Sequence, residues 1–307
     1  MSQTAVIYRS AAPAHVVGEN GTDEYVLWPM RFASPLMRYM VNSVRQRRGS
    51  SGELQTNHLL FDGLGPLCRK IKEGAASWQA LDIIYNYRGE GSLVDKLWIG
   101  YMRNAQAVRN RKRIISAELR ELAIETAMRN GSVKVLSLAS GSAQAVFEAL
   151  ANFPYPIEIM LIDFDRDAGP YAKCLAQVHG LSDVATFKTG NVMKFDRKVL
   201  LGEFQPDIIE MAGLLDYLRE DEAIAIIGRV HALLPPDGAF ITCHIHDNPE
   251  REFMSEIIDW GREGTRQRPM LYRSHHELVE LVRKGGFDKL VIYTERHAIH
   301  SVAIARK

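Results

Sequence analysis

Four short segments of the chain place small or polar residues where runs of apolar, β-branched residues end. They are the turn 138–143, the acid pair at 163 and 165, the stretch 190–192 and the stretch 210–213. Open parallel sheets bind their ligands at the carboxyl ends of the strands. We therefore expect the four segments to lie together and to form one ligand site.

The first two segments suit a ligand that contains a ribose. In the turn, Ala139, Ser140 and Gly141 are small, so the backbone can approach a ligand closely, and the helix that follows presents free N–H groups. A carboxylate at the end of the second strand, either Asp163 or Asp165, can accept both hydroxyls of a ribose.

The third and fourth segments complete this predicted site. Asn191 can hydrogen-bond an adenine edge, Val192 lies beside it in the sequence, and Met211 belongs to the fourth segment. Each segment alone also has an ordinary structural interpretation, because a lone acid after a strand is often a turn former. The order and spacing of all four favour a ligand site.

Three side chains near the predicted strand ends are candidate catalytic groups. Glu210, His244 and Tyr272 could accept a proton or position a substrate, although an ordinary hydrogen bond is the alternative for each. His244 and His246 share one face of a strand, as two metal ligands would. The sequence offers no third ligand nearby, so we predict no metal.

Strand and helix patterns alternate from residue 131 to residue 285, which is typical of a parallel sheet with helices on both faces. We predict an α/β fold: a doubly wound, Rossmann-like, seven-stranded sheet that is mostly parallel and ends in an antiparallel hairpin. Before it, a helix that Ser116 caps ends at Asn130-Gly131. The predicted strands are 133–138, 157–162, 185–188, 207–211, 239–244, 289–294 and 301–305.

The composition is that of an ordinary soluble protein. The 307 residues are 46% hydrophobic and 24% charged, and the net charge of +1 disfavours a dedicated nucleic-acid-binding protein. The three cysteines are far apart, no apolar run is long enough for a membrane span, and the first residues lack the pattern of a secretory signal. We expect a cytoplasmic protein with a small-molecule substrate and no nucleic-acid partner.

From residue 133 onward the chain resembles the class I S-adenosylmethionine (SAM)-dependent methyltransferases. Those enzymes have a glycine-rich turn, an acid that ends strand two, an Asp or Asn after strand three and an Asp that opens strand four. The stretch 233–238 also matches their turn before strand five. The corresponding residues here are Ser140-Gly141-Ser142, Asp163, Asn191 and Asp207.

The resemblance implies SAM as the cofactor and methyl transfer to a carboxylate or hydroxyl of a small molecule. Stretches at 213–218, 248–249, 259–260 and 271–273 are similar to a bacterial subgroup often labelled as making 3-hydroxy fatty acid methyl esters. The residues expected to bind SAM are Ala139, Ser140, Gly141, Asp163, Asp165, Asn191, Val192 and Met211.

The turn departs from the family pattern. The positions that are usually an acid and three glycines are Ser137, Ala139, Gly141 and Ala143, so one glycine is kept. Ser137 replaces an acid that often helps to hold the SAM amino group. The departure leaves two alternatives open: a SAM enzyme that cyclises the aminobutyrate portion and releases methylthioadenosine, and a SAM-binding regulator without turnover.

Residues 1–130 are predicted to be a mainly helical region that serves as a lid, a substrate-binding part or a dimer contact, and residues 131–307 the SAM-binding domain. The first fifty residues carry many aromatic side chains, which could cage a cationic sulfonium, with a hinge at 49–52. The basic runs 45–48 and 109–113 are expected to be solvated, unless the second closes over the cofactor or binds a carboxylate.

Overall fold

One eight-stranded sheet carries the predicted strand ends. The structure, a computed structural model, describes residues 5–10, 29–51, 56–194, 202–262 and 268–307. The strand order is β1-β7-β8-β6-β5-β2-β3-β4. The strands are β1 (Ala5–Ser10), β2 (Val133–Leu138), β3 (Ile157–Asp163), β4 (Ala185–Thr189), β5 (Ile208–Met211), β6 (Ala239–Ile245), β7 (Lys289–Thr294) and β8 (His300–Arg306).

The strand directions confirm the predicted fold class. The neighbours β6, β5, β2, β3 and β4 run parallel, and β8 runs antiparallel between β6 and β7. The sheet has one strand more than the seven expected, because β1 pairs parallel with β7. The extra strand comes from a part of the chain for which the sequence indicated a mainly helical region.

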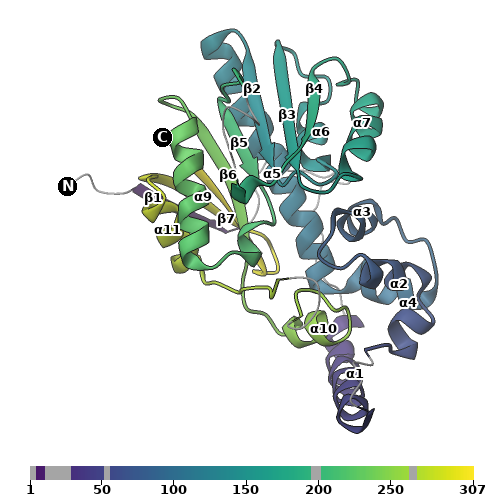
Figure 1. The fold of residues 1–307 in the computed structure, drawn as a ribbon. Helices are drawn as coiled ribbons and strands as arrows, with labels where there is room; N and C mark the ends of the chain where they lie inside the picture. Colours follow the sequence, from purple (N-terminus) through teal and green to yellow (C-terminus); the bar gives the residue numbers. More distant parts are fainter. Residues whose placement is uncertain (1–4, 11–28, 52–55, 195–201, 263–267) are drawn as a thin grey trace.

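Helices cover both faces of the sheet (Figure 1). Neighbouring residues of a strand point to opposite faces. Val135 of β2 therefore packs with α5 (Arg103–Asn130), α6 (Gln144–Leu150) and α7 (Ala168–Val178), whereas Leu136 packs with α9 (Glu220–Leu233) and α11 (His275–Lys284). Burial on both faces explains why β2 is apolar at Val133, Val135, Leu136 and Leu138, on both of its faces.

The helix α5 is longer than expected and connects the sheet to the rest of the molecule. It ends at Gly131, which has φ +80° and suits the left-handed conformation of a helix C-terminus. Ser116, predicted as an N-cap, lies in the middle of α5, where its hydroxyl donates to the carbonyl of Ala145. That prediction was wrong because Ser in a helix interior can hydrogen-bond a neighbouring element instead.

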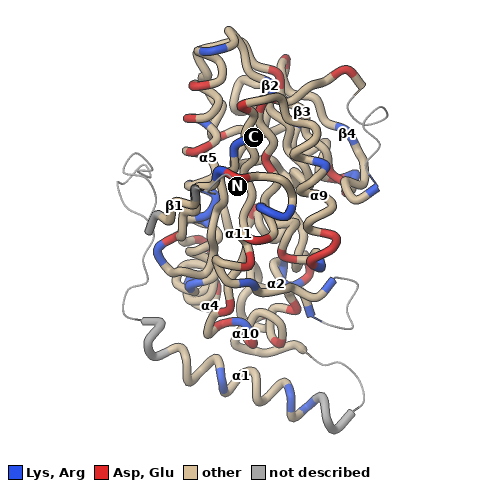
Figure 2. Tube along the Cα trace, turned by 90° about the vertical axis from the view of Figure 1, so that its left-hand side faces the viewer, with Lys and Arg blue, Asp and Glu red and all other residues tan. Residues whose placement is uncertain are grey.

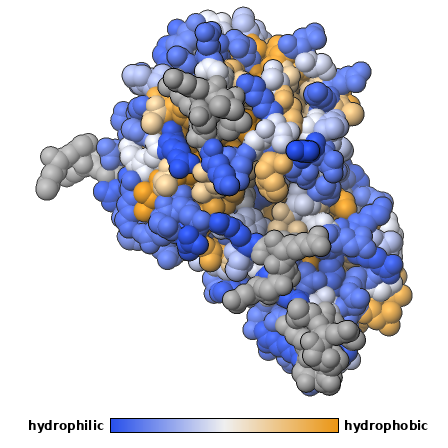
Figure 3. All heavy atoms as spheres, in the orientation of Figure 1, coloured by the Kyte–Doolittle hydropathy of each residue, from blue (hydrophilic) through white to orange (hydrophobic). Residues whose placement is uncertain are grey.

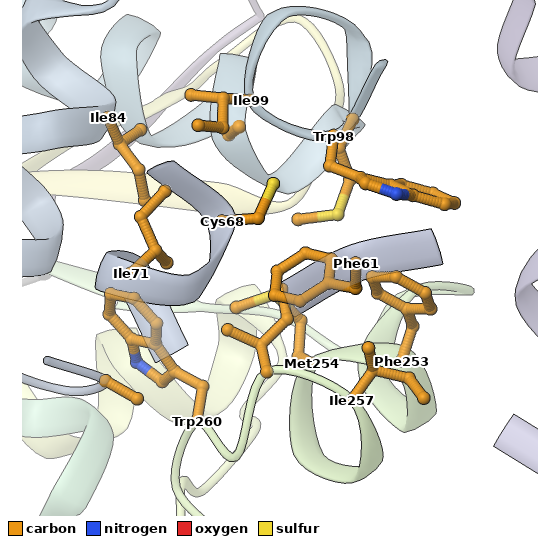
Figure 4. Close-up of a cluster of buried hydrophobic side chains, with 14 of the residues drawn as sticks. Phe61, Cys68, Ile71, Ile84, Trp98, Ile99, Phe253, Met254, Ile257 and Trp260 are labelled. Carbon is orange, nitrogen blue, oxygen red and sulfur yellow. The ribbon is translucent and has the colours of Figure 1, made fainter. Parts of the chain in front are cut away.

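A group of short helices lies beyond one end of the sheet (Figure 1). Its core includes rings from both halves of the chain: the centroids of Trp98 and Phe253 are 4.7 Å apart, and those of Phe61 and Phe253 are 5.8 Å apart (Figure 4). The members are α1 (Pro29–Ser51), η1 (Leu59–Gly63), α2 (Pro66–Glu73), α3 (Trp78–Asn86), α4 (Leu93–Asp95), η2 (Lys96–Tyr101) and α10 (Arg251–Glu256). The remaining short turns are η3 (Val192–Lys194) and η4 (Leu215–Tyr217).

Two expectations for the N-terminal region differ from the structure. Residues 49–51 are the last residues of α1 rather than a flexible loop, and Gly52 lies outside the described residues. The run 109–113 is mostly buried inside the molecule, with Arg111 only 3% exposed, instead of forming a solvated face. A buried guanidinium needs polar partners, so the groups that pair with Arg111 must also lie in the interior of the protein.

Candidate active site

A cavity of about 270 Å³ lies where the carboxyl ends of β2, β3 and β5 meet the group of short helices. Its wall is mostly apolar, and it contains residues from the strand ends, from α3, η2 and α5, and from the segment that follows β6. This is the edge of the sheet at which such folds bind ligands. The sequence-predicted residues that line it are Ala139, Ser140, Gly141, Asp163, Asp165 and Glu210.

The turn after β2 has an unusual backbone. Ala139, Gly141 and Ala143 have φ values of +53°, +50° and +56°, in the left-handed region that favours glycine. These are the positions that are glycine in the family pattern, so the backbone shape is kept although two side chains have changed. A Cβ added at Gly141 would lie 2.8 Å from Cβ of Trp78. Close packing against α3 therefore requires glycine at 141.

The two acids after β3 hold the turn and the wall of the cavity. Asp163 is buried and accepts hydrogen bonds from the backbone N–H of Gly141 at 2.7 Å and of Asp165 at 2.9 Å. Burial raises the pKa of Asp163 above its ordinary range, against the opposing effect of these N–H donors. Asp165 accepts from the indole N–H of Trp78 at 2.8 Å. Each carboxylate keeps lone pairs for a further donor.

Three of the predicted cofactor-binding residues do not line the cavity. Asn191 is exposed, and its side-chain oxygen accepts from the backbone N–H of Met193 at 2.9 Å. Val192 and Met211 are buried in the core on the α9 side of the sheet. Met211 points to that side because it follows Glu210 on β5, and successive strand residues face opposite ways. Their contact with a cofactor stays a prediction.

Glu210 is the acid of the cavity wall that comes from β5. It is 5% exposed, stands opposite Ser137 in the pairing of β2 with β5, and accepts the Ser137 hydroxyl at 2.5 Å. Burial raises its pKa to about 7, although the Ser137 hydroxyl, the N–H of Ala212 and the charge of Arg111 act in the other direction. A buried acid with such a pKa can exchange a proton near neutral pH or bind a cation.

A second set of buried polar groups surrounds Arg111 of α5. Its guanidinium donates to the hydroxyl of Tyr85 at 3.1 Å and lies 4.0 Å from a carboxylate oxygen of Asp216. Burial raises the pKa of Asp216, but His244, His300 and Arg111 outweigh it and hold the pKa below its ordinary value. Burial lowers the pKa of His300 well below its ordinary value, so this ring is neutral at pH 7. Arg111, Asp216, Tyr85 and His300 all line the cavity.

The other two candidate bases lie outside the cavity lining. His244 is fully buried, and its Nδ1 is 2.7 Å from Asp216 Oδ1, at an ion-pair distance but without hydrogen-bond alignment. Tyr272 packs under the guanidinium of Arg251, 4.4 Å from the ring centroid. His246 contacts the carbonyl of Arg273 and the Ser301 hydroxyl, and burial lowers its pKa to about 4. Among the described residues, no three metal-ligating side chains gather around either histidine.

The family model described as "Putative methyltransferase" matches residues 42–307. The chain belongs to this family. The match begins within α1, so it includes the group of short helices as well as the sheet. All residues that line the cavity therefore lie inside the part of the chain that the family model matches.

The chain is similar at low sequence identity to one curated protein and to several solved structures. The Escherichia coli protein YnbC is 25% identical over 242 residues, which are 76% of this chain and 41% of YnbC, so the match spans about two fifths of that relative. A Bordetella parapertussis structure, described as "a possible exported protein", is 19% identical with a TM-score of 0.67, covering 92% of this chain and 99% of its own. A "putative O-methyltransferase" of Nostoc punctiforme PCC 73102 is 16% identical with a TM-score of 0.50, covering 80% and 71%.

Most of the aromatic wall lies outside the first fifty residues, where the sequence led us to expect it. Among the aromatic residues of that segment, Tyr8 and Tyr39 are more than half exposed, and Tyr25 and Trp28 lie outside the described residues. Four rings of the cavity wall come from helices that carry no recognisable motif, so no local signal could have found them: Phe61, Trp78, Tyr85 and Trp98. The other three are Phe164, between the two acids, and Tyr217 and Trp260, which lie in the stretches 213–218 and 259–260 that resemble the bacterial subgroup.

Proposed function

We propose that this protein is a SAM-dependent methyltransferase that acts on a carboxylate or hydroxyl of a small molecule. Family membership supports methyl transfer, and the Nostoc neighbour's description as an O-methyltransferase supports an oxygen acceptor. The observation that carries the proposal is a set of buried polar atoms in the cavity wall without a hydrogen-bond partner among the described residues. These atoms are Asn104 Oδ1, Arg111 Nε, Ser140 Oγ, Gln144 Oε1 and both ring nitrogens of His300.

Unpaired buried polar atoms cost stability unless a ligand or water pairs with them. Their placement fits SAM. Ser140 and Gln144 flank the turn after β2, and Asp163 can accept the ribose hydroxyls next to that turn. Asn191, Val192 and Met211 would contribute only if the cofactor extends past the lining. When bound, SAM supplies an electrophilic methyl group on a positively charged sulfur.

The aromatic wall suits such a cation. Trp78, Tyr85 and Trp98 line the cavity, and aromatic faces attract cations within a few ångströms. The same rings exclude water, which would otherwise compete with the acceptor. Alignment of the acceptor with the methyl group then accounts for much of the rate, because the displacement needs little more than positioning.

A hydroxyl acceptor also requires that a proton be removed, and we assign this to His300. It is the neutral imidazole in the cavity wall, and both of its nitrogens lack a partner among the described residues. Neither His244, which lies 2.7 Å from Asp216, nor Tyr272 belongs to the cavity lining. A carboxylate acceptor needs no base, so the effect of His300→Ala on kcat distinguishes the two acceptor classes.

Product analysis tests the function directly. The purified protein is incubated with SAM and a metabolite extract, and the nucleoside products are measured by mass spectrometry. S-adenosylhomocysteine supports the proposal. Methylthioadenosine would instead support the cyclising alternative, and SAM binding without either product would support the regulator.

The proposal includes a small-molecule substrate and no nucleic-acid partner. Acidic and basic residues are interspersed along the trace (Figure 2), and the face in Figure 3 is mostly hydrophilic with small hydrophobic patches. Burial of the run 109–113 withdraws these cations from phosphate contacts. No helix in the described part of the chain is long and apolar enough to cross a membrane. A cytoplasmic location and a homodimer stay predictions, for fractionation and light scattering to test.

A further inference from the structure

The acid that the family pattern places at position 137 is absent from β2, but an acid stands beside it. Glu210 faces Ser137 across the β2–β5 pairing and accepts its hydroxyl at 2.5 Å, and Glu210 lines the cavity. We propose that Glu210, positioned by Ser137, binds the ammonium group of the methionine portion of SAM. The acidic function has thus moved from one strand to its neighbour. This inference rests on the proposed function.

The surroundings of Glu210 favour a cationic ligand. The groups that face it are Ser137 on β2, Tyr85 on α3, Arg111 on α5 and Cys243 on β6. Among the described residues, no Lys, Arg or His nitrogen lies within ion-pair distance of its carboxylate, and the nearest cation, Arg111, pairs with Asp216. A buried carboxylate without an ion-pair partner is costly. A ligand ammonium would supply the missing charge.

The same end of the cavity can hold the other charge of an amino acid. Arg111 is buried, and its Nε has no hydrogen-bond partner among the described residues. An arginine N–H suits a carboxylate oxygen. The cavity wall therefore presents the carboxylate of Glu210 together with the guanidinium of Arg111, whose ion-pair partner Asp216 is also in the wall. Glu210 and the Nε of Arg111 match the ammonium and carboxylate of the methionine portion.

An alternative role for Glu210 is that of the general base. The two roles make different demands on binding. A base acts on the acceptor, so its loss lowers kcat and leaves the affinity for S-adenosylhomocysteine unchanged. An anchor for the ammonium acts in the binary complex, so its loss lowers that affinity in the absence of any acceptor.

Calorimetry with two ligands separates these roles. S-adenosylhomocysteine carries the amino acid portion, and methylthioadenosine lacks it. We expect Glu210→Gln to bind S-adenosylhomocysteine about tenfold to a hundredfold more weakly, the scale of a lost charged hydrogen bond, and to bind methylthioadenosine as the wild type does. The matched control is Asp163→Asn, which should weaken both ligands because both contain the ribose.

Proton release on ligand binding gives a second readout. Glu210 is partly protonated near pH 7 in the free protein, and a bound ammonium favours its ionised form. Binding of S-adenosylhomocysteine at pH 6.5 should therefore release protons, which calorimetry in buffers of different ionisation enthalpy detects. Glu210→Gln should abolish this release, and methylthioadenosine should not cause it.

Several outcomes would overturn the inference. One is that Glu210→Gln loses affinity equally for S-adenosylhomocysteine and methylthioadenosine. Another is that its affinity for both ligands is unchanged. If that variant does not fold, the swap Ser137→Glu with Glu210→Ser returns the acid to the family's position, and it should retain the preference for S-adenosylhomocysteine over methylthioadenosine; loss of that preference in the folded swap contradicts the anchor. A wild type that binds neither ligand contradicts the proposed function itself, and the inference with it.

Discussion

At the scale of single residues, the two acids after β3 accept hydrogen bonds from the protein itself in the absence of a ligand. Asp163 accepts hydrogen bonds from the backbone N–H groups of Gly141 and Asp165, and Asp165 accepts one from the indole N–H of Trp78. The sequence left open which of the two contacts a ribose. Asp163 is the stronger candidate, because it is the more buried of the two and touches the turn directly.

Replacement of Asp163 by Ala should weaken the binding of SAM and of S-adenosylhomocysteine by about 1.5–3 kcal/mol, the scale of a charged hydrogen bond. Part of this loss arises because the N–H of Gly141 loses its acceptor and the turn is less well fixed. Isothermal calorimetry measures the change, and Asp165→Ala is the matched control that removes the contacts with the Trp78 indole and the N–H of Asp167 but leaves the Gly141 contact intact. Unchanged affinity in both variants would rule out a ribose contact at either acid.

Glu210 should also give the ligand-free protein a measurable dependence on pH. Burial raises its pKa from 4.5 to about 7, so between these values the folded chain holds a proton that the unfolded chain has released. The stability that this group contributes is therefore present below pH 4.5 and is lost as the pH rises through about 7. Each unit of pKa shift corresponds to about 1.4 kcal/mol.

The corresponding variant, Glu210→Gln, has no proton to lose there. Relative to the wild type, it should gain stability between pH 5 and pH 8, as measured by denaturant unfolding at both values. His246 and other groups titrate in both proteins, so the difference between them isolates Glu210. Parallel pH profiles for the two proteins would contradict the raised pKa.

At the scale of elements, the turn after β2 and the helix α3 form one unit. The sequence indicated a ligand turn because small residues follow an apolar strand. It could not indicate that Trp78, sixty residues earlier, packs against Gly141, because nothing in the local pattern of α3 encodes that contact. The same limit applies to Ser116, whose hydroxyl bonds to the distant residue Ala145 instead of capping a helix.

A valine at position 141 should therefore disturb the turn and the aromatic wall together. The backbone there has φ +50°, which disfavours a branched side chain, and the new Cβ would lie 2.8 Å from that of Trp78. We expect Gly141→Val to fold with lower stability and to lose S-adenosylhomocysteine binding by more than about a hundredfold. A folded variant with normal affinity would show that the turn is not part of the cofactor site.

A matched control at Ala143 tests the backbone argument. Ala143 has φ +56°, so Ala143→Gly should relieve strain of about 1 kcal/mol while it retains ligand affinity. Thermal unfolding and calorimetry measure both quantities. If Ala143→Gly destabilises the protein, the backbone at Ala143 is not strained.

At the scale of the whole molecule, the sheet could be predicted because its strands are periodic, local signals. The hairpin β7–β8 and the capped helix α11 follow from such patterns as well. The group of short helices could not be assembled in the same way, because its core joins α1 and η1 to α10, two hundred residues away. The strand β1 was missed because a lone edge strand carries little periodic signal, and its partner β7 is the last but one strand of the chain.

Two deletions test how the N-terminal part contributes to the whole. Deletion of residues 1–28 removes β1 and keeps α1, whereas deletion of residues 1–51 removes both. Met37, Met40, Val41 and Val44 of α1 are buried in the core that α10 shares. Their loss should make the second deletion less stable than the first by about 5 kcal/mol or more, since each such side chain contributes about 1.5–3 kcal/mol on burial.

Ligand affinity should respond differently from stability, and this difference decides the role of the N-terminal part. The strand β1 lies at the opposite end of the sheet order from β3 and β4, away from the cavity beside β2, β3 and β5. Deletion of residues 1–28 should therefore leave the affinity for S-adenosylhomocysteine unchanged if these residues only complete the sheet. A lid, in contrast, would gain protection from hydrogen exchange on ligand binding, and its deletion would cost activity more than stability. Hydrogen exchange of the full chain with and without S-adenosylhomocysteine, read together with the activity of the shorter deletion, separates the two: ligand-dependent protection within residues 1–50 and a large loss of activity support the lid, whereas equal protection and full activity make this part a scaffold.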